Sequence, residues 1–203
     1  RASTRRHSSP RRRRVDIPRM STVQTPHIRR SWRALFDEPH AADAEALARC
    51  WVTPPVDRSS PAARLHPQAL RGASVRCRPG TTDAQVFDDT FVGLYHLPPI
   101  DLPEDATILD LGGNVGYTAA NFAALCPRGT VVCVEMDAAN AQAARDNLAP
   151  FGPRCRVIEA AAWDRDGEIV YGGTEEWGFR VASLSGDTPT PLGDRRVRAR
   201  ALS

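Results

Sequence analysis

A glycine-rich loop at residues 112–116 has the clearest capacity for chemistry in this sequence. Gly112 and Gly116 permit a sharp turn and a close backbone approach to a ligand, and the amide groups of a following helix favour an anionic group. Asp110 precedes the loop inside an apolar run, where an unpaired carboxylate is costly. The loop therefore predicts a ligand with an anionic group and a cation or donor near Asp110. For the glycines alone, a tight turn that binds nothing stays an alternative.

Glu135 is a second acidic residue in a position to bind that ligand. It ends the next apolar run, where a carboxylate accepts hydrogen bonds from the adjacent hydroxyls of a ribose. The dinucleotide pattern G-x-G-x-x-G would need glycine at the positions of Asn114 and Tyr117, and the chain has no lysine for a P-loop. These residues favour a nucleoside ligand that carries a carboxylate and a positive charge. S-adenosylmethionine has these features.

Alternating elements must position the loop and Glu135. Short apolar runs at 107–111, 130–135 and 156–160 predict strands, and the stretches 117–125 and 137–148 predict helices. The order β-α-β-α-β is typical of a parallel sheet with right-handed crossovers. The carboxyl ends of such strands meet at one edge, where ligands bind in open α/β sheets.

Shorter elements are expected on both sides of this unit. Upstream, the pattern predicts a helix at 41–51, a strand at 74–77 and a helix to residue 91 capped by Thr82, with a Pro- and Arg-containing linker from 53 to 72. Downstream, a turn at 164–167 leads to strand-like residues 168–171, and residues 197–201 alternate as a further strand.

The chain resembles the FkbM family of class I methyltransferases in four blocks that occur in order. The blocks are Arg78–Asp83 with Val86, Phe87, Phe91, Val92 and Tyr95; Ile108–Thr118; Val134–Glu135; and Ala161–Gly167. The resemblance implies a Rossmann-like α/β fold and methyl transfer from S-adenosylmethionine. In that family the acceptor is usually an oxygen of a natural product, a sugar or a lipid-linked glycan.

The resemblance also implies roles for individual residues. The loop residues would hold the methionyl part, Asp110 its ammonium side and Glu135 the ribose, while Met136 and the Ala161–Ala162 segment would flank adenine. Asp83 and Tyr95 would close the pocket, although Asp83 is equally a helix-cap neighbour and Tyr95 a core aromatic. The expected cofactor-binding residues are Asp83, Tyr95, Asp110, Gly112, Gly113, Asn114, Gly116, Glu135, Met136 and Ala161.

No residue is assigned as the catalytic base. His96 is the histidine nearest to the expected pocket, but a lone histidine is more often structural. Glu175 and Glu176 would line an acceptor site or belong to a solvated loop. Five cysteines without a C-x-x-C pair predict reduced thiols rather than a disulfide framework or a zinc site, and no metal is expected.

The family's acidic K-x-D-x-E-G-like motif is expected after the segment matching 197–203, and it is not found. We therefore expect an incomplete Rossmann-like sheet, truncated at its C-terminus, with an open edge and an uncovered face. The expected parts are a disordered Arg-rich tail at 1–31, a helix and Pro-rich linker at 32–73, and the N-terminal part of a methyltransferase domain at 74–203.

Charge and hydropathy limit the classes of binding partner expected for this chain. Residues 1–33 hold 11 Arg against one acid, whereas residues 34–203 hold 16 Arg against 23 acids, which excludes a uniformly basic nucleic-acid-binding domain. No apolar run reaches the roughly 20 residues of a membrane span. A cytoplasmic chain with a small-molecule or glycan substrate, and with neither nucleic acid nor membrane as partner, is expected. An NAD-type oxidoreductase, a non-catalytic fragment and an RNA-binding accessory protein that uses the tail stay open as alternatives.

Overall fold

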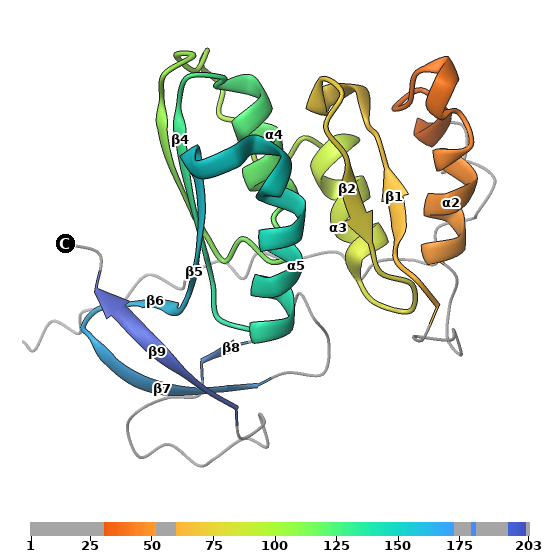
Figure 1. The fold of residues 1–203 in the computed structure, drawn as a ribbon. Helices are drawn as coiled ribbons and strands as arrows, with labels where there is room; N and C mark the ends of the chain where they lie inside the picture. The colour runs from red at the N-terminus through yellow and green to blue at the C-terminus, as the bar shows by residue number, and fades with distance from the viewer. Residues whose placement is uncertain (1–30, 52–59, 173–179, 182–194, 202–203) are drawn as a thin grey trace, which may run out of the picture.

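The computed structural model describes residues 31–51, 60–172, 180–181 and 195–201. Its central element is a three-stranded parallel sheet in the order β3-β4-β5 (Figure 1). The strands are β3 (Thr107–Leu111), β4 (Thr130–Glu135) and β5 (Cys155–Glu159), joined through α4 (Tyr117–Leu125), α5 (Ala138–Leu148) and the 3-10 segment η3 (Ala149–Arg154). The predicted order of strands and helices and the Rossmann-like α/β fold are confirmed. The tail and Glu175–Glu176 lie outside the described residues.

The parallel register explains how the loop and Glu135 come together. Asp110 is paired with Cys133 and Leu111 with Val134, so β3 and β4 end side by side. The loop follows β3 at this edge, and Glu135 is the last residue of β4. The backbone carbonyl of Glu135 accepts a hydrogen bond from Ala160 at 3.0 Å, which ties the end of β4 to the chain that leaves β5.

The upstream region packs against α4 and α5 as helices and a hairpin. Its elements are η1 (Glu38–His40), α2 (Asp43–Cys50), β1 (Ala63–Leu65), η2 (Gln68–Leu70), β2 (Val75–Cys77) and α3 (Asp83–Phe91). The stretch expected to be a linker thus contains β1, which pairs antiparallel with β2, and η2. Leu65 and Leu70 are buried there. Two isolated leucines among prolines and arginines give no periodic signal, so the sequence did not reveal these elements.

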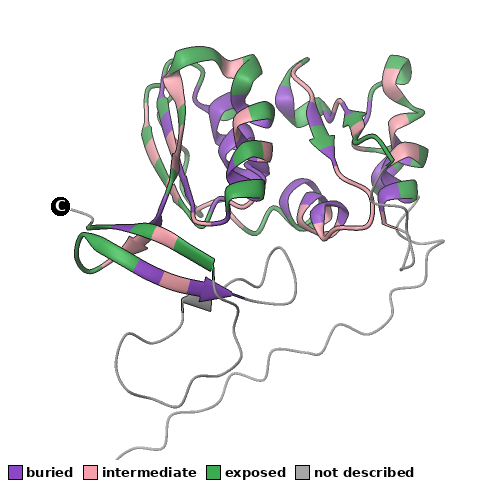
Figure 2. Ribbon diagram, turned by 60° about the horizontal axis from the view of Figure 1, so that its bottom comes forward, coloured by how far each residue is buried: buried purple, intermediate pink, exposed green. Residues whose placement is uncertain are grey.

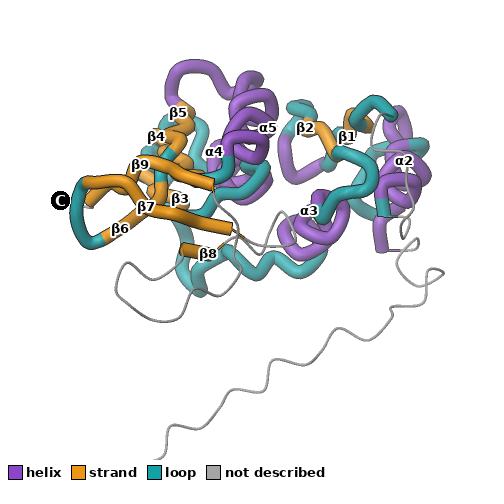
Figure 3. Tube along the Cα trace, turned by 90° about the horizontal axis from the view of Figure 1, so that it is seen from below, coloured by secondary structure: helices purple, strands orange, loops and turns teal. Residues whose placement is uncertain are grey.

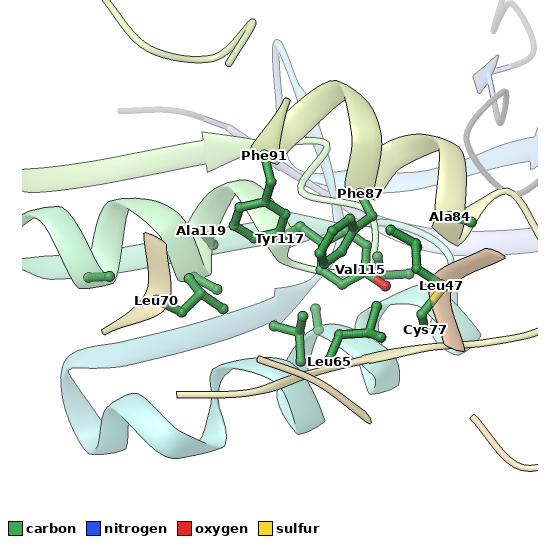
Figure 4. Close-up of a cluster of buried hydrophobic side chains, with 14 of the residues drawn as sticks. Leu47, Leu65, Leu70, Cys77, Ala84, Phe87, Phe91, Val115, Tyr117 and Ala119 are labelled. Carbon is green, nitrogen blue, oxygen red and sulfur yellow. The ribbon is translucent and has the colours of Figure 1, made fainter. Parts of the chain in front are cut away.

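A single large core joins the upstream region to the helices of the sheet (Figure 4). Phe87 and Phe91 of α3 pack against Tyr117 of α4, with ring centroids 5.6 and 6.1 Å apart. The Tyr117 hydroxyl donates to the Arg76 carbonyl at 2.6 Å, so this buried polar group is satisfied. The start of α4, directly after the glycine loop, is therefore anchored in the core.

A second sheet follows β5, in the order β6-β9-β7-β8. Its strands are β6 (Ala161–Trp163), β7 (Gly167–Gly172), β8 (Arg180–Val181) and β9 (Arg195–Ala201). Figure 1 shows these strands below the parallel sheet, and Figure 3, seen from below, shows them grouped in front of β3, β4 and β5. Ala161, Ile169 and Ala199 form its small buried cluster, and Met136 packs against them.

The face of β3 turned away from the core is uncovered in the described part of the chain. Leu109 is 51% exposed and Leu111 46% exposed, whereas Ile108 between two exposed neighbours packs against the core. Figure 2, coloured by burial, shows that helices and strands alike carry both buried and exposed residues. Among the described residues, nothing covers Leu109 and Leu111, while the truncation of the sheet stays a prediction.

Among the described helices, none combines the length and the apolar character that crossing a bilayer requires.

Candidate cofactor site

The glycine loop has a backbone shape that few residue types adopt. Gly112, Asn114 and Gly116 have positive φ angles of 77°, 50° and 81°. A Cβ on Gly113 would lie 2.2 Å from Cys133 Sγ, so this position also needs glycine, here for space. On Gly116 it would lie 3.1 Å from Ala144 of α5. The loop lies close to the sheet at Gly113 and close to α5 at Gly116 because these two glycines have no side chain, whereas Gly112 is required for its positive φ.

The amide groups of the loop are bound by the protein itself. Gly112 and Gly113 both donate to the Val134 carbonyl, at 2.9 and 3.1 Å. Asn114 N–H donates to Glu135 Oε2 at 2.9 Å, and Gly116 N–H to the Gly113 carbonyl at 2.8 Å. The loop is therefore fixed in place before any ligand arrives.

Glu135 connects the two sequence motifs directly. Its Oε1 accepts from the Asp137 amide at 2.8 Å while Oε2 accepts from Asn114, and the residue is only 6% exposed. Burial raises the pKa of Glu135, and backbone hydrogen bonds from Asp137, Asn114 and Met136 oppose that rise. A carboxylate offers about four acceptor sites, so Glu135 keeps acceptor capacity for a ligand hydroxyl.

Asp110 lies under the loop with an unsatisfied oxygen. Its Oδ2 is buried without a hydrogen-bond partner in the described part of the chain, and so is Oδ1 of Asn114. Burial raises the pKa of Asp110 to about 6, although a hydrogen bond from the Ala119 backbone acts in the opposite direction and lowers it. A buried acceptor without a donor is costly, so both oxygens fit a site that is completed by donor or cationic groups of a ligand.

The raised pKa of Asp110 predicts a pH-dependent stability. The folded chain binds this proton more tightly than the unfolded chain, so stability falls as pH rises from about 4 to about 6. Asp110→Asn removes that loss. In urea unfolding, the free energy of unfolding of Asp110→Asn is expected to rise relative to that of wild type between about pH 4 and about pH 6. The difference should persist at pH 7. A difference that stays constant from about pH 4 to pH 7 would contradict the assignment.

Asp83 is placed apart from the loop hydrogen bonds. Its Oδ1 accepts from Arg78 Nη2 at 2.8 Å, and its Oδ2 accepts from both Nε and the backbone amide of Arg78 at 2.9 Å. Arg78 Nη2 also donates to Asn140 Oδ1 of α5 at 2.8 Å. Asp83 is 1% exposed and begins α3, where Thr82 is the N-cap residue but makes no side-chain cap hydrogen bond. Its contact with a cofactor stays a prediction.

Tyr95 and His96 both reach the first turns of α4. The Tyr95 hydroxyl lies 3.3 Å from Thr118 Oγ1, and the residue is 66% exposed, so it stands beside the loop rather than in the core. His96 Nε2 lies 2.9 Å from Asn121 Oδ1, and burial lowers the pKa of His96. The structure thus brings Tyr95 close to the site and gives His96 a structural partner.

Met136 and Ala161 lie together where the two sheets meet. Met136 follows Glu135 directly and packs against the buried cluster to which Ala161 belongs. The structure therefore gathers Asp110, the loop, Glu135, Met136 and Ala161 around the carboxyl ends of β3 and β4.

No family model matches this sequence. A curated relative, the AMB antimetabolite synthetase AmbE of Pseudomonas aeruginosa, is 30% identical over 119 residues, which is 58% of this chain. The chain spans only 6% of the length of that relative.

Several solved structures resemble parts of the fold. They include a precorrin-6y C5,15-methyltransferase from Geobacter metallireducens (26% identity, 34% of this chain and 36% of that chain, TM-score 0.29). A SAM-dependent methyltransferase from Agrobacterium tumefaciens is 16% identical over 53% of this chain and 34% of that chain, with a TM-score of 0.35. The methyltransferase FkbM from Methylobacillus flagellatus is 12% identical over 71% of this chain and 34% of that chain, with a TM-score of 0.33. These TM-scores are too low to carry an inference, so the fold assignment rests on the strand order and register of this chain.

Two further polar residues, outside the set expected from the sequence, support the site. Asn147 Nδ2 donates to the Val115 carbonyl at 2.8 Å, and Asn147 Oδ1 accepts from the Arg76 amide at 2.7 Å, so it joins the loop to β2. Asp137 caps α5 by accepting from the Ala139 and Asn140 amides. An aspartate before an Ala-rich helix is a recognisable cap signal, whereas a buried asparagine inside a helix is not.

Proposed function

We propose that this chain carries the cofactor-binding part of an S-adenosylmethionine-dependent methyltransferase. One observation supports this most directly: the amide of Asn114, at the tip of the glycine loop, donates to the carboxylate of Glu135. The two residues expected to bind the methionyl and ribose parts therefore form one continuous surface. The resemblance to the FkbM family in four ordered blocks supports the same cofactor.

The polar groups at this surface fit the charge of that cofactor. S-adenosylmethionine carries an ammonium and a sulfonium group, and when bound it supplies an electrophilic methyl group. The unpartnered Oδ2 of Asp110 and Oδ1 of Asn114 offer acceptors for the ammonium group. The free acceptor sites of Glu135 suit the ribose hydroxyls, and Met136 offers an apolar wall for adenine.

The same geometry disfavours a dinucleotide cofactor. A pyrophosphate needs backbone amides that point at it, and the amides of Gly112 and Gly113 are already bound to the Val134 carbonyl. Tyr117, at the position where the dinucleotide pattern needs its third glycine, is fully buried and fills the core. The chain also lacks the second glycine, at Asn114. The occupied amides limit binding of a methionyl carboxylate as well, so the preference for a methyl donor over NAD rests on Asn114 and Tyr117.

The proposed acceptor is a hydroxyl group of a small natural product, a sugar or a glycan. The FkbM resemblance implies oxygen as the acceptor atom, and similarity to a stretch of an antimetabolite synthetase supports a small biosynthetic product. Displacement at a methyl group needs the donor and acceptor in line and water excluded. In this proposal Tyr95, whose hydroxyl lies 3.3 Å from Thr118 Oγ1 at the start of α4, would shield the site from water, and no residue is assigned as the base.

Glu135→Gln tests the site with a conservative change. The amide keeps one acceptor oxygen but loses the other, so either a ribose hydroxyl or a backbone amide loses its partner. Affinity for S-adenosylhomocysteine, measured by calorimetry, is expected to fall about tenfold, which is about 1.4 kcal/mol. Wild type should show no comparable affinity for NAD.

Glu159→Gln is the matched control. Glu159 is the register partner of Glu135 on β5, but it is partly exposed and its carboxylate pairs with Arg145 on the surface of the molecule. The control should bind S-adenosylhomocysteine as wild type does. Equal affinity in Glu135→Gln and Glu159→Gln, or tighter binding of NAD by wild type, would refute the proposal.

A further inference from the structure

A cluster of two histidines and an aspartate lies in the upstream region, away from the glycine loop. His40 ends η1, Asp43 begins α2, and His66 follows β1. Their candidate ligand atoms all lie within 4.8 Å of one another. In Figure 1, α2 and β1 are on the side of the molecule opposite the parallel sheet. We propose that His40, Asp43 and His66 form a binding site for a divalent transition metal, with zinc as the best match.

The ligand types and distances match zinc. Two imidazoles and a carboxylate form a common three-ligand set, with water in the fourth position. Zinc lies about 2.0–2.1 Å from such atoms, so tetrahedral ligands stand about 3.3 Å apart. His66 Nδ1 and Asp43 Oδ2 are 3.0 Å apart. With all three ligand atoms within 4.8 Å of one another, the His40 ring nitrogen has to close by at most about 1.5 Å to reach that spacing.

The backbone around the cluster already holds the ligands. The His66 amide donates to Asp43 Oδ2 at 2.7 Å, which orients the carboxylate toward the imidazole of the same residue. The residues after His66 are fixed by the Phe36–Pro67 bridge and by the 2.8 Å hydrogen bond from Gln68 N–H to the Leu35 carbonyl. Hydrogen bonds of this kind orient metal ligands in advance.

The histidine rings have the freedom that metal capture needs. They are stacked with centroids 4.0 Å apart and an angle of 15° between their planes. An imidazole nitrogen binds a metal that lies in the plane of its ring. The two rings must therefore rotate out of their stacked arrangement until both planes contain the same metal position. No hydrogen bond to the His40 ring is recorded in the described part of the chain, and all three residues are partly exposed. Rotation of the His40 ring therefore breaks only a stacking contact, whereas rotation of the His66 ring also breaks its 3.0 Å contact with Asp43.

The surrounding charge favours a cation. The neighbouring surface cavity is lined by the acidic residues Asp37, Glu38 and Glu45 and by Arg33, which pairs with Glu45 at 3.2 Å. With neutral imidazoles, the ligand set itself carries one negative charge. A bound metal would link η1, α2 and the β1–η2 connection, so it would stabilise the folded chain.

Zinc titration of the full chain after treatment with a chelator tests the proposal. Calorimetry should detect a zinc site in wild type, and Co²⁺ should give the visible absorption of a tetrahedral site. His40→Gln and His66→Gln should each weaken zinc binding at least about tenfold. His96→Gln is the matched control, because His96 is a partly buried histidine outside the cluster, and it should leave zinc affinity unchanged.

Melting temperatures separate loss of metal from loss of fold. Without metal, His40→Gln should melt close to wild type, and zinc should raise the melting temperature of wild type and of His96→Gln only. All variants keep the five cysteines and the remaining histidines. Equal zinc affinity in wild type, His40→Gln and His66→Gln would place the metal elsewhere and overturn the proposal. Absence of zinc binding by wild type would overturn it as well, leaving a His66–Asp43 ion pair.

Discussion

Gly113→Ala is expected to reduce affinity for S-adenosylhomocysteine at least about a hundredfold, or about 2.7 kcal/mol. The new Cβ would lie 2.2 Å from Cys133 Sγ and 3.1 Å from Asp110 Oδ2, so the loop or the sulfur must move. Movement of the loop breaks its hydrogen bonds to Val134 and Glu135. The added methyl group should also lower the free energy of unfolding by about 1–3 kcal/mol.

Two further variants identify the cause of that loss. Cys133→Ala combined with Gly113→Ala removes the sulfur from the clash and should recover a large part of both affinity and stability. Gly112→Ala places its Cβ in open space, so it should show only the cost of a positive φ, about 1–2 kcal/mol of stability. Calorimetry and urea unfolding measure both quantities. Wild-type affinity in Gly113→Ala would show that this loop does not hold the cofactor.

Arg78→Ala is expected to have the largest effect on stability, about 3–5 kcal/mol. The change leaves the carboxylate of Asp83 buried, with a side chain that is 1% exposed, and removes both side-chain hydrogen bonds that Arg78 makes to it. It also removes the link from Arg78 to Asn140 of α5. Urea unfolding followed by circular dichroism measures this loss.

Arg76→Ala is a matched control two residues away. Arg76 pairs with Asp146 at 3.5 Å, and its side chain is 54% exposed, so its loss should cost less than about 1 kcal/mol. The double variant Arg78→Met with Asp83→Asn should be more stable than Arg78→Ala, because no buried charge is left alone. If Arg78→Ala and Arg76→Ala have equal effects, the buried pair does not stabilise the fold as argued.

Most regular elements follow from local sequence patterns. Residues 107–111 and 130–135 are short β-branched and apolar runs, and the structure has strands with these same bounds. The helix at 117–125 is confirmed likewise, and α3 spans Asp83–Phe91 as its apolar spacing predicts. In β4, α4 and α3 the patterns succeed because they mark the apolar residues that are buried. In β3, where Leu109 and Leu111 are about half exposed, the strand is held by its pairing with β4.

Local sequence patterns do not predict contacts between segments that are far apart in the sequence. Leu65 and Leu70 are buried against residues remote in sequence, so no local pattern around them predicts a strand or a helix. Asn147 binds Val115 and Arg76, and His66 meets Asp43 across 23 positions. No spacing rule connects such residues, because their proximity depends on how the helices and hairpin pack.

The sequence by itself determined the βαβ unit, the glycine loop and the positions of Asp110 and Glu135 at strand ends. Each of these depends on residue type and short spacing, which local conformational preferences control. The tertiary structure alone decided that Asn114 donates to Glu135, that one oxygen of Asp110 has no hydrogen-bond partner among the described residues, and that His40, Asp43 and His66 converge. The physical reason is that hydrogen bonding and burial depend on three-dimensional neighbours, which packing brings together from separate parts of the chain.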